Sequence, residues 1–130
     1  FRSGNESSSF CKEINFPIIK AFRIKDDTFK SEISKYDVSA FLFDTFTKKN
    51  YGGTGKTFDW ELLKSGFQGP FIHSGGLNIN NVLDAINATN PDAIDISSGL
   101  EDYPGKKNHE KIFEFFKLIK NTSKKGSLWN

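Results

Sequence analysis

FLFDTFTKKNYGGTGKTFDW, residues 41–60, is the stretch on which the fold assignment depends. It joins an apolar run ending in Asp44 to a glycine-rich segment, GGTGKT, that is similar to part of a nucleotide-binding P-loop. The P-loop pattern places another glycine five residues before Gly55, and Asn50 occupies that position. The apolar run also ends too early for the tight strand–loop–helix unit that cradles phosphate. We therefore interpret the stretch as a strand followed by a glycine-rich surface loop, or by a mobile loop that closes over an active site, and not as an ATPase loop.

Composition narrows the class of protein. The chain has 130 residues, enough for one domain with a hydrophobic core, and its 14 phenylalanines supply apolar bulk. Its 18 basic and 16 acidic residues nearly balance, so there is no electrostatic footprint for nucleic acid. No apolar run reaches the length of a membrane span. A single cysteine, Cys11, excludes an internal disulfide and suits a reducing compartment, so we expect a cytoplasmic protein in which Cys11 is a buried helical thiol.

Strand and helix patterns alternate along the chain. Short apolar and β-branched runs predict strands at residues 17–24, 40–44, 70–74 and 93–97. Helical patterns cover residues 7–14, 26–36, 59–63, 79–88 and 112–119, with Asp59 and Asn78 as capping residues ahead of two of them.

This alternation indicates an α/β fold with a parallel sheet and right-handed crossover connections. Two architectures fit it: a doubly wound open sheet, or part of a (β/α)8 barrel, whose full form needs eight units and about 250 residues. No linker divides the chain, so we expect one domain over residues 1–130, with a flexible tail over residues 122–130.

The C-terminal ends of the predicted strands, where both architectures place function, carry residues suited to chemistry. One strand ends in Asp44, whose carboxylate could donate a proton or cap a loop. The next two strands end in Ser74-Gly75-Gly76 and Ser97-Ser98-Gly99. Glycines ahead of a helix let backbone amides approach an anion, so two such turns favour a phosphate site over simple tight turns. His73, alone in an apolar strand, is interpreted as a core residue because no metal-ligand spacing surrounds it.

Five segments occur in an order that resembles one known family. They are IIKAFRI, FLFDT, YGGTGKTFDW, GGLNINNV and IDISSGLEDYPGKKNHEKI, and the match runs from about Gly4 to Lys120. They resemble phosphoribosylanthranilate isomerase, an enzyme of tryptophan biosynthesis that carries out an Amadori rearrangement without cofactor or metal. The resemblance implies a (β/α)8 TIM barrel of which this chain supplies the C-terminal half, strands five to eight, preceded in the family by an N-terminal half.

The resemblance also implies roles for individual residues. Asp44 matches the family's general acid, and Asp95 and Arg23 match positions near the substrate. In the family, backbone amides at the last two strand ends bind the substrate phosphate, and a glycine-rich loop bends over the substrate. The matching residues are Gly75, Gly76, Ser98 and Gly99 for the phosphate, and Gly52, Gly53 and Gly55 for the loop.

Departures from the family pattern limit the expected activity. The family's base is a cysteine in a K-[IV]-C-G motif on the first strand, which this sequence lacks, and Cys11 does not stand in that context. The fourth-strand motif is altered to FRSGNE, and IHSGGL has His73 and Ser74 where the family more often has an apolar residue and alanine. We therefore expect a phosphorylated small-molecule substrate but little or no turnover by this chain alone.

Partners follow from the open edges of a half-barrel. Unpaired strand edges predict self-association, or pairing with the N-terminal half of the barrel. The alternative is a stand-alone phosphate-ligand-binding module with an open flavodoxin-like sheet, monomeric and without isomerase activity. Neither interpretation includes nucleic acid or a membrane as a partner.

Overall fold

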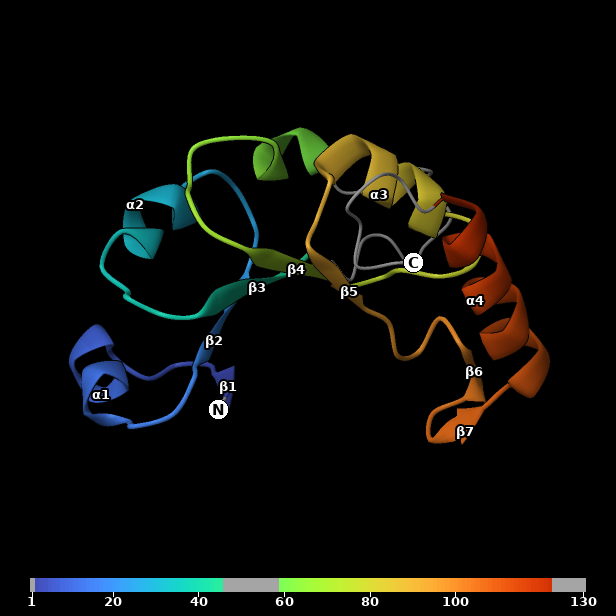
Figure 1. Ribbon diagram of the computed structural model, residues 1–130, viewed down its shortest axis with the longest axis horizontal. Helices are drawn as coiled ribbons and strands as arrows, with labels where there is room; N and C mark the ends of the chain where they lie inside the picture. The colour runs from blue at the N-terminus through green and yellow to red at the C-terminus, as the bar shows by residue number, and fades with distance from the viewer. Residues whose placement is uncertain (1, 46–58, 123–130) are drawn as a thin grey trace.

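A five-stranded parallel sheet forms the centre of the molecule (Figure 1). The computed structural model describes residues 2–45 and 59–122. The strands are β1 (Arg2–Ser3), β2 (Ile19–Arg23), β3 (Ala40–Asp44), β4 (Phe71–Ser74) and β5 (Ala93–Asp95). The helices are α1 (Ser8–Glu13), α2 (Phe29–Ile33), the short 3-10 helix η2 (Trp60–Leu63), α3 (Val82–Thr89) and α4 (His109–Thr122).

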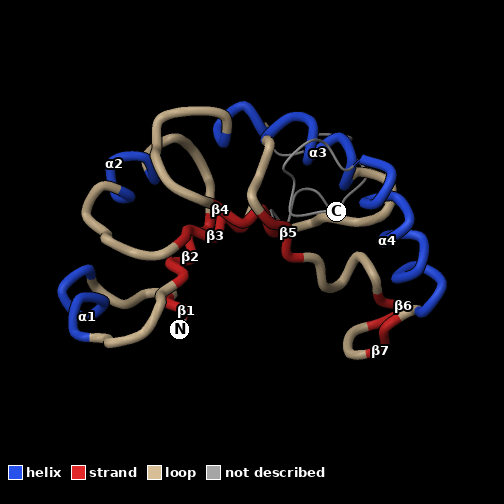
Figure 2. Tube along the Cα trace, in the orientation of Figure 1, coloured by secondary structure: helices blue, strands red, loops and turns tan. Residues whose placement is uncertain are grey.

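The order of the strands in the sheet separates the two architectures left open by the sequence. The strands lie in chain order, β1-β2-β3-β4-β5, and every neighbouring pair is parallel. Figure 2 shows the sheet as an arc, with the helices along its outer, convex side. A flavodoxin-like sheet has the order 2-1-3-4-5 and carries helices on both faces. The open flavodoxin-like alternative is therefore wrong for this chain.

The four predicted strands are confirmed, and a fifth precedes them. β3 has the predicted bounds, and β2, β4 and β5 lie within the predicted runs. The two-residue β1 pairs with β2, with Arg2 opposite Ile19 and Ser3 opposite Lys20. The altered FRSGNE motif thus still forms a strand, because ladder hydrogen bonds come from the backbone and need no particular side chain.

Two helices begin at a side chain that caps them, and one of these is the predicted Asp59. Ser7 Oγ accepts a hydrogen bond from the Phe10 amide at 3.2 Å at the start of α1. Asp59 Oδ1 accepts one from the Glu61 amide at 3.0 Å at the start of η2.

Two other helices are shorter than predicted, because side chains bond the backbone ahead of them. Asp26 Oδ1 accepts from the Thr28 amide at 2.9 Å, so a turn precedes α2, and hydrogen bonds from Thr28 lower the pKa of Asp26. The predicted cap Asn78 lies in a turn closed by Asn81, whose Oδ1 accepts from the Asn78 amide at 2.8 Å. α3 therefore begins at Val82, since such bonds compete with helical ones.

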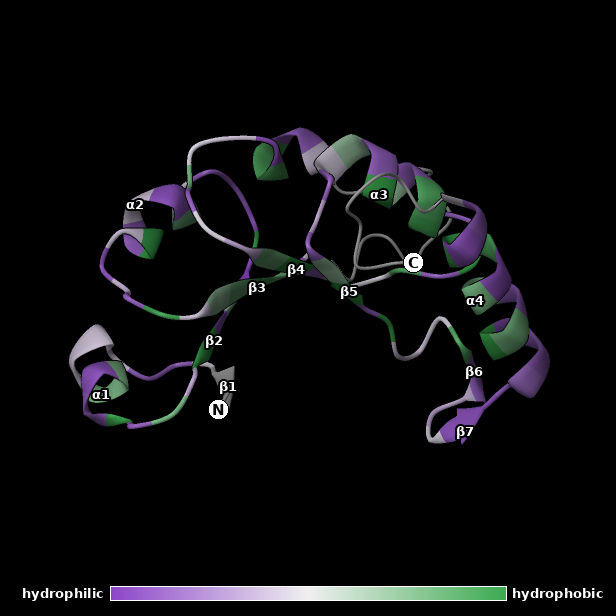
Figure 3. Ribbon diagram, in the orientation of Figure 1, coloured by the Kyte–Doolittle hydropathy of each residue, from purple (hydrophilic) through white to green (hydrophobic). Residues whose placement is uncertain are grey.

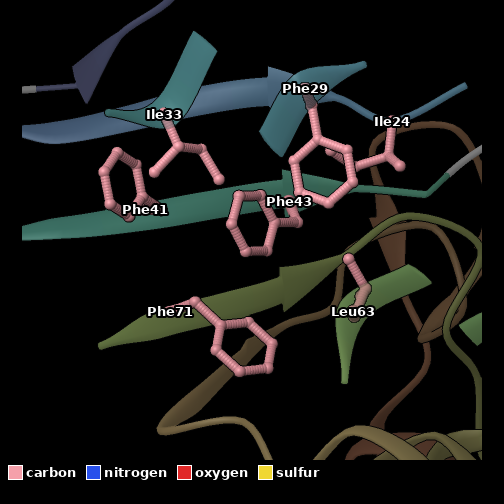
Figure 4. Close-up of a cluster of buried hydrophobic side chains, with 7 residues drawn as sticks. All are labelled: Ile24, Phe29, Ile33, Phe41, Phe43, Leu63 and Phe71. Atoms are coloured by element: carbon pink, nitrogen blue, oxygen red, sulfur yellow. The ribbon is translucent and has the colours of Figure 1, made fainter. Parts of the chain in front are cut away.

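Aromatic side chains fill the layer between the sheet and its outer helices. Phe43 is fully buried, and the ring centroids of Phe29 and Phe71 lie 5.3 and 5.4 Å from its own. The cluster, drawn in Figure 4, consists of Ile24, Phe29, Ile33, Phe41, Phe43, Leu63 and Phe71. A second cluster beneath α3 and α4 consists of Val82, Leu100, Phe115 and Ile119. Figure 3 shows the matching bands of hydrophobic residues along β3, α3 and α4. Burial of these two clusters holds the helices on the sheet.

The one charged side chain in this buried layer, among the described residues, is Lys20, which is 2% exposed. Its ammonium group donates to the carbonyl oxygens of Gly4 and Glu6, and lies 4.5 Å from the ring centroid of Tyr36. Tyr36 also donates, through its hydroxyl, to the Glu6 carbonyl at 3.1 Å. A buried ammonium is tolerated only when it is hydrogen-bonded, so Lys20 fastens the segment after β1 to β2.

An antiparallel hairpin follows β5 and was not predicted. It consists of β6 (Glu101–Tyr103) and β7 (Lys106–Lys107), joined by a turn in which Gly105 has φ +87°. Its strands are too short and polar for the alternation that signals a strand. The hairpin matters for function because it begins two residues after Gly99.

Candidate active site

The C-terminal ends of four neighbouring strands present one row of polar side chains. The register places Arg23 of β2 beside Asp44 of β3. Asp44 lies beside Ser74 of β4, and Ser74 lies beside Asp95 of β5. The Ser74 hydroxyl donates a hydrogen bond to Asp95 Oδ2 at 3.3 Å. Registered residues of parallel strands share a face, so all four lie on the face opposite the aromatic layer. Arg23 is exposed, and Asp44 is half-buried.

A small cavity lies at this row and collects most of the sequence-predicted site residues. Its volume is about 160 Å³, and its lining includes Asp44, Gly75, Gly76, Asp95 and Ser98. These residues come from the ends of three different strands. The structure thus brings these five residues together at one cavity. Arg23 is not part of the lining and lies one strand further along the row.

The turn after β4 has the backbone that only glycine adopts easily. Gly75 and Gly76 have φ values of +95° and +66°, in the left-handed region. A Cβ placed on Gly76 would meet no atom within 4 Å, so the space beside this backbone is open. Asn81 Nδ2 donates to the Gly76 carbonyl at 3.0 Å and holds the turn against the start of α3. An anion approaching the turn would meet backbone and not side chains.

The turn after β5 lies directly against the first one. Asn78 and Gly99 form an isolated parallel bridge, and a Cβ on Gly99 would lie 1.9 Å from the Leu77 carbonyl oxygen. Any other residue at position 99 would push the two turns apart. Gly99 therefore brings Ser98 up to the cavity but is not itself part of the lining.

Lys107 belongs to this region and was missed by sequence reasoning. Its ammonium group donates to the Ser97 carbonyl at 3.0 Å and to Glu101 Oε1 at 2.7 Å. The hairpin turn brings it back beside the residues that precede Gly99. The Pro104-Gly105 pair was the available signal, because it predicts a chain reversal that places Lys107 opposite Glu101.

His73 lies in the core, as the sequence suggested. It is fully buried on the outer face of β4, with its ring 6.1 Å from that of Trp60 in an edge-on arrangement. Burial penalises the charged imidazolium and lowers the pKa of His73 to about 4. Cys11 is buried on α1, far along the sheet from the cavity row.

Some of the predicted residues lie outside the described part of the chain. Gly52, Gly53 and Gly55, and all of the tail except Thr122, lie outside the described residues. Within residues 2–45 and 59–122, no cluster of three or more His, Cys, Asp or Glu side chains could hold a metal ion. In the same ranges, no helix is long and apolar enough to cross a membrane.

Comparison with known proteins decides the family. A family model described as N-(5'-phosphoribosyl)anthranilate (PRA) isomerase matches residues 3–118. The chain belongs to this family. The curated PRA isomerase of Geobacter metallireducens is 42% identical over 118 residues, which cover 90% of this chain and 58% of that protein.

Solved PRA isomerases have the same arrangement of strands and helices. The Thermotoga maritima enzyme superimposes with a TM-score of 0.73 at 36% identity, covering 92% of this chain and 59% of that one. A PRA isomerase bound to reduced 1-(o-carboxyphenylamino)-1-deoxyribulose 5-phosphate gives 0.68 at 30% identity, over 88% and 55% of the two chains. This chain thus spans less than three fifths of the length of these relatives.

Proposed function

We propose that this chain supplies the general acid and the phosphate-binding part of a PRA isomerase active site. One observation carries the proposal: Asp44 and the glycine turns after β4 and β5 meet at a single cavity at the C-terminal rim of the sheet. The fold family places function at this rim. The ligand bound in one solved relative is a sugar that carries a phosphate group and a carboxyphenylamino group. The glycine turns are suited to the phosphate group of such a ligand.

The chemistry assigned to Asp44 is proton donation. Asp44 protonates the ring oxygen of N-(5-phosphoribosyl)anthranilate, the bond from that oxygen to C1 breaks, and a Schiff base forms between C1 and the anthranilate nitrogen. A base then removes the proton from C2, and tautomerisation gives the aminodeoxyribulose phosphate. C2 is oxidised from an alcohol to a ketone while C1 is reduced to the amine level, so the reaction consumes no external oxidant or reductant.

The phosphate end of the substrate is assigned to the two glycine turns. Gly75 and Gly76 are assigned to bind it through their backbone amides, since the space beside Gly76 is open, and Ser98 lines the same cavity. Amides preorganised in this way bind an anion without the entropy cost of ordering long side chains. Asp95 and Arg23 lie on the same row, and we assign them to positions beside the sugar of the substrate.

The rest of the active site comes from a second polypeptide segment. We assign β2 to β5 as strands five to eight of a (β/α)8 barrel and β1 as the end of the fourth, with the K-[IV]-C-G segment and its base on the other half. The ends of the arc support such a partner: α1 and α4 lie at its two ends (Figure 1), and phenylalanines in or next to these helices are exposed. Phe16, after α1, is 74% exposed, and Phe113 and Phe116 of α4 are 73% and 59% exposed. The partner is the complementary half-barrel or a second copy of this chain.

Turnover of N-(5-phosphoribosyl)anthranilate tests the proposal, followed as loss of the anthranilate-adduct fluorescence. The chain alone should turn over little, and mixing it with the N-terminal half of a family member should restore activity. Asp44→Asn should then lower kcat by about 10²-fold or more, because one general acid is lost. Unchanged activity of Asp44→Asn in the mixture would show that the acid is assigned wrongly. Turnover by the chain alone, abolished by Asp44→Asn, would instead mean that a base is already present here.

A further inference from the structure

A buried chain of hydrogen bonds connects α3 to the cavity through His73. His73 Nδ1 lies 3.2 Å from Thr89 Oγ1, and His73 Nε2 lies 3.4 Å from Thr45 Oγ1. All three side chains are almost fully buried, with exposures of 0%, 6% and 2% for His73, Thr89 and Thr45. We call these three residues the buried relay.

The hydroxyl partners define which ring nitrogen carries the proton. Thr89 donates its hydroxyl hydrogen to the Ala85 carbonyl at 2.8 Å, so towards His73 it can only accept. His73 must therefore donate from Nδ1, and the neutral ring then has a lone pair on Nε2. That lone pair faces the Thr45 hydroxyl.

Thr45 carries the relay to the rim. It directly follows Asp44, and its amide donates to the Ser74 carbonyl at 2.9 Å. Its hydroxyl lies 3.1 Å from the Ser74 carbonyl oxygen and 3.2 Å from that of Gly75. The Thr45 hydroxyl has one hydrogen to donate, so the lone pair on His73 Nε2 competes for it with two carbonyls that lead into the glycine turn.

We infer that His73 is a positioning residue, which sets the turn at Gly75 and Gly76 and the end of β3 by holding the Thr45 hydroxyl in place. The inference deepens the proposed function and rests on it for its consequence, since this turn is the assigned phosphate site. Nothing in the relay touches substrate. Its effect is on where the amides of the turn point.

Two pairs of substitutions in the full chain separate positioning from packing. Asn at position 73 places its amide nitrogen near the Nδ1 position, within reach of Thr89. Gln at the same position reaches the Nε2 position, within reach of Thr45. His73→Gln should therefore keep the wild-type amide resonances of Gly75 and Gly76 in nitrogen–proton NMR spectra, and His73→Asn should shift them. Thr45→Val should shift the same resonances, and Thr89→Val, which removes the equivalent hydroxyl on the helix side, should leave them near wild type.

Titration with inorganic phosphate, followed at the same two amides, gives the functional consequence. We expect about tenfold weaker binding in His73→Asn and Thr45→Val, and less than about twofold in His73→Gln and Thr89→Val, since only the first two remove the contact between position 73 and the Thr45 hydroxyl. The inference would fail if His73→Asn and His73→Gln shifted the resonances equally, and Thr45→Val and Thr89→Val did so too. His73 would then only fill space. If the wild-type chain bound no phosphate, the proposed function would fail, and the resonances without phosphate would still decide the positioning role.

Discussion

His73 links the buried layer of the protein to solution pH. Its pKa falls from 6.5 to about 4 on folding, because the buried ring loses its contact with water and this disfavours the charged imidazolium. Between these two values the unfolded chain binds more protons than the folded chain, so the free energy of unfolding rises with pH. The contribution is fully present above about pH 6.5, and it is lost as the pH falls towards 4.

Urea unfolding at pH 4.5 and pH 7.5 checks this dependence. When the pH is lowered from 7.5 to 4.5, the free energy of unfolding of the wild-type chain should fall by roughly 2–3 kcal/mol more than that of His73→Leu. His109 is exposed at the start of α4 and provides the control, since His109→Asn should keep the wild-type slope. The same pH slope in His73→Leu and the wild type would show that the ring is not buried as described.

At the scale of elements, α3 ends in a conformation that few residues accept. Asn90 has φ +48° and ψ +55°, and its amide donates to the Ile86 carbonyl at 2.8 Å. The left-handed backbone costs an ordinary side chain about 1 kcal/mol, whereas glycine accepts it and asparagine accepts it better than most.

Replacement of Asn90 therefore has a defined outcome. Asn90→Ala should lower the free energy of unfolding by about 1 kcal/mol, and Asn90→Gly should not lower it. Asn87→Ala, at an exposed position within the same helix, should leave stability unchanged or raise it slightly. Equal stability of the two Asn90 variants in urea titrations would contradict the left-handed cap.

The elements also show what sequence can and cannot predict. β-branched and aromatic runs predicted the strands well, because burial in a parallel sheet demands such runs. The starts of α2 and α3 were missed, because local bonds from Asp26 and Asn81 compete with the helix and leave no periodic trace. The cavity residues were predictable because parallel strands end at one rim. Thr45 was not, because its partner is set by packing. Lys107 was missed, although the Pro104-Gly105 pair indicates the chain reversal that places it opposite Glu101.

At the scale of the whole molecule, the arc leaves apolar surface at both ends. The exposed rings of Phe113 and Phe116 lie on α4, and Phe16 lies at the opposite end of the arc. Such rings on a monomer would favour association, since burial of each contributes about 2 kcal/mol.

Sedimentation velocity over a range of concentrations tests this association. The chain should self-associate, and the double substitution Phe113→Lys with Phe116→Lys should move association to at least about tenfold higher concentration. Tyr103 is 63% exposed on the hairpin, and Tyr103→Lys serves as a control that should change little. A strictly monomeric wild-type chain at all concentrations would argue against a missing barrel partner.

The chain-order arrangement of the strands has a consequence for protein synthesis. Each strand from β2 to β5 pairs with the one made just before it, so a strand leaving the ribosome meets a partner that is already present. After β1, no strand of this sheet has to wait for a later one before it can pair. The chain can therefore add one strand and one helix at a time as it is translated, and the edge waiting for its next partner is always the newest.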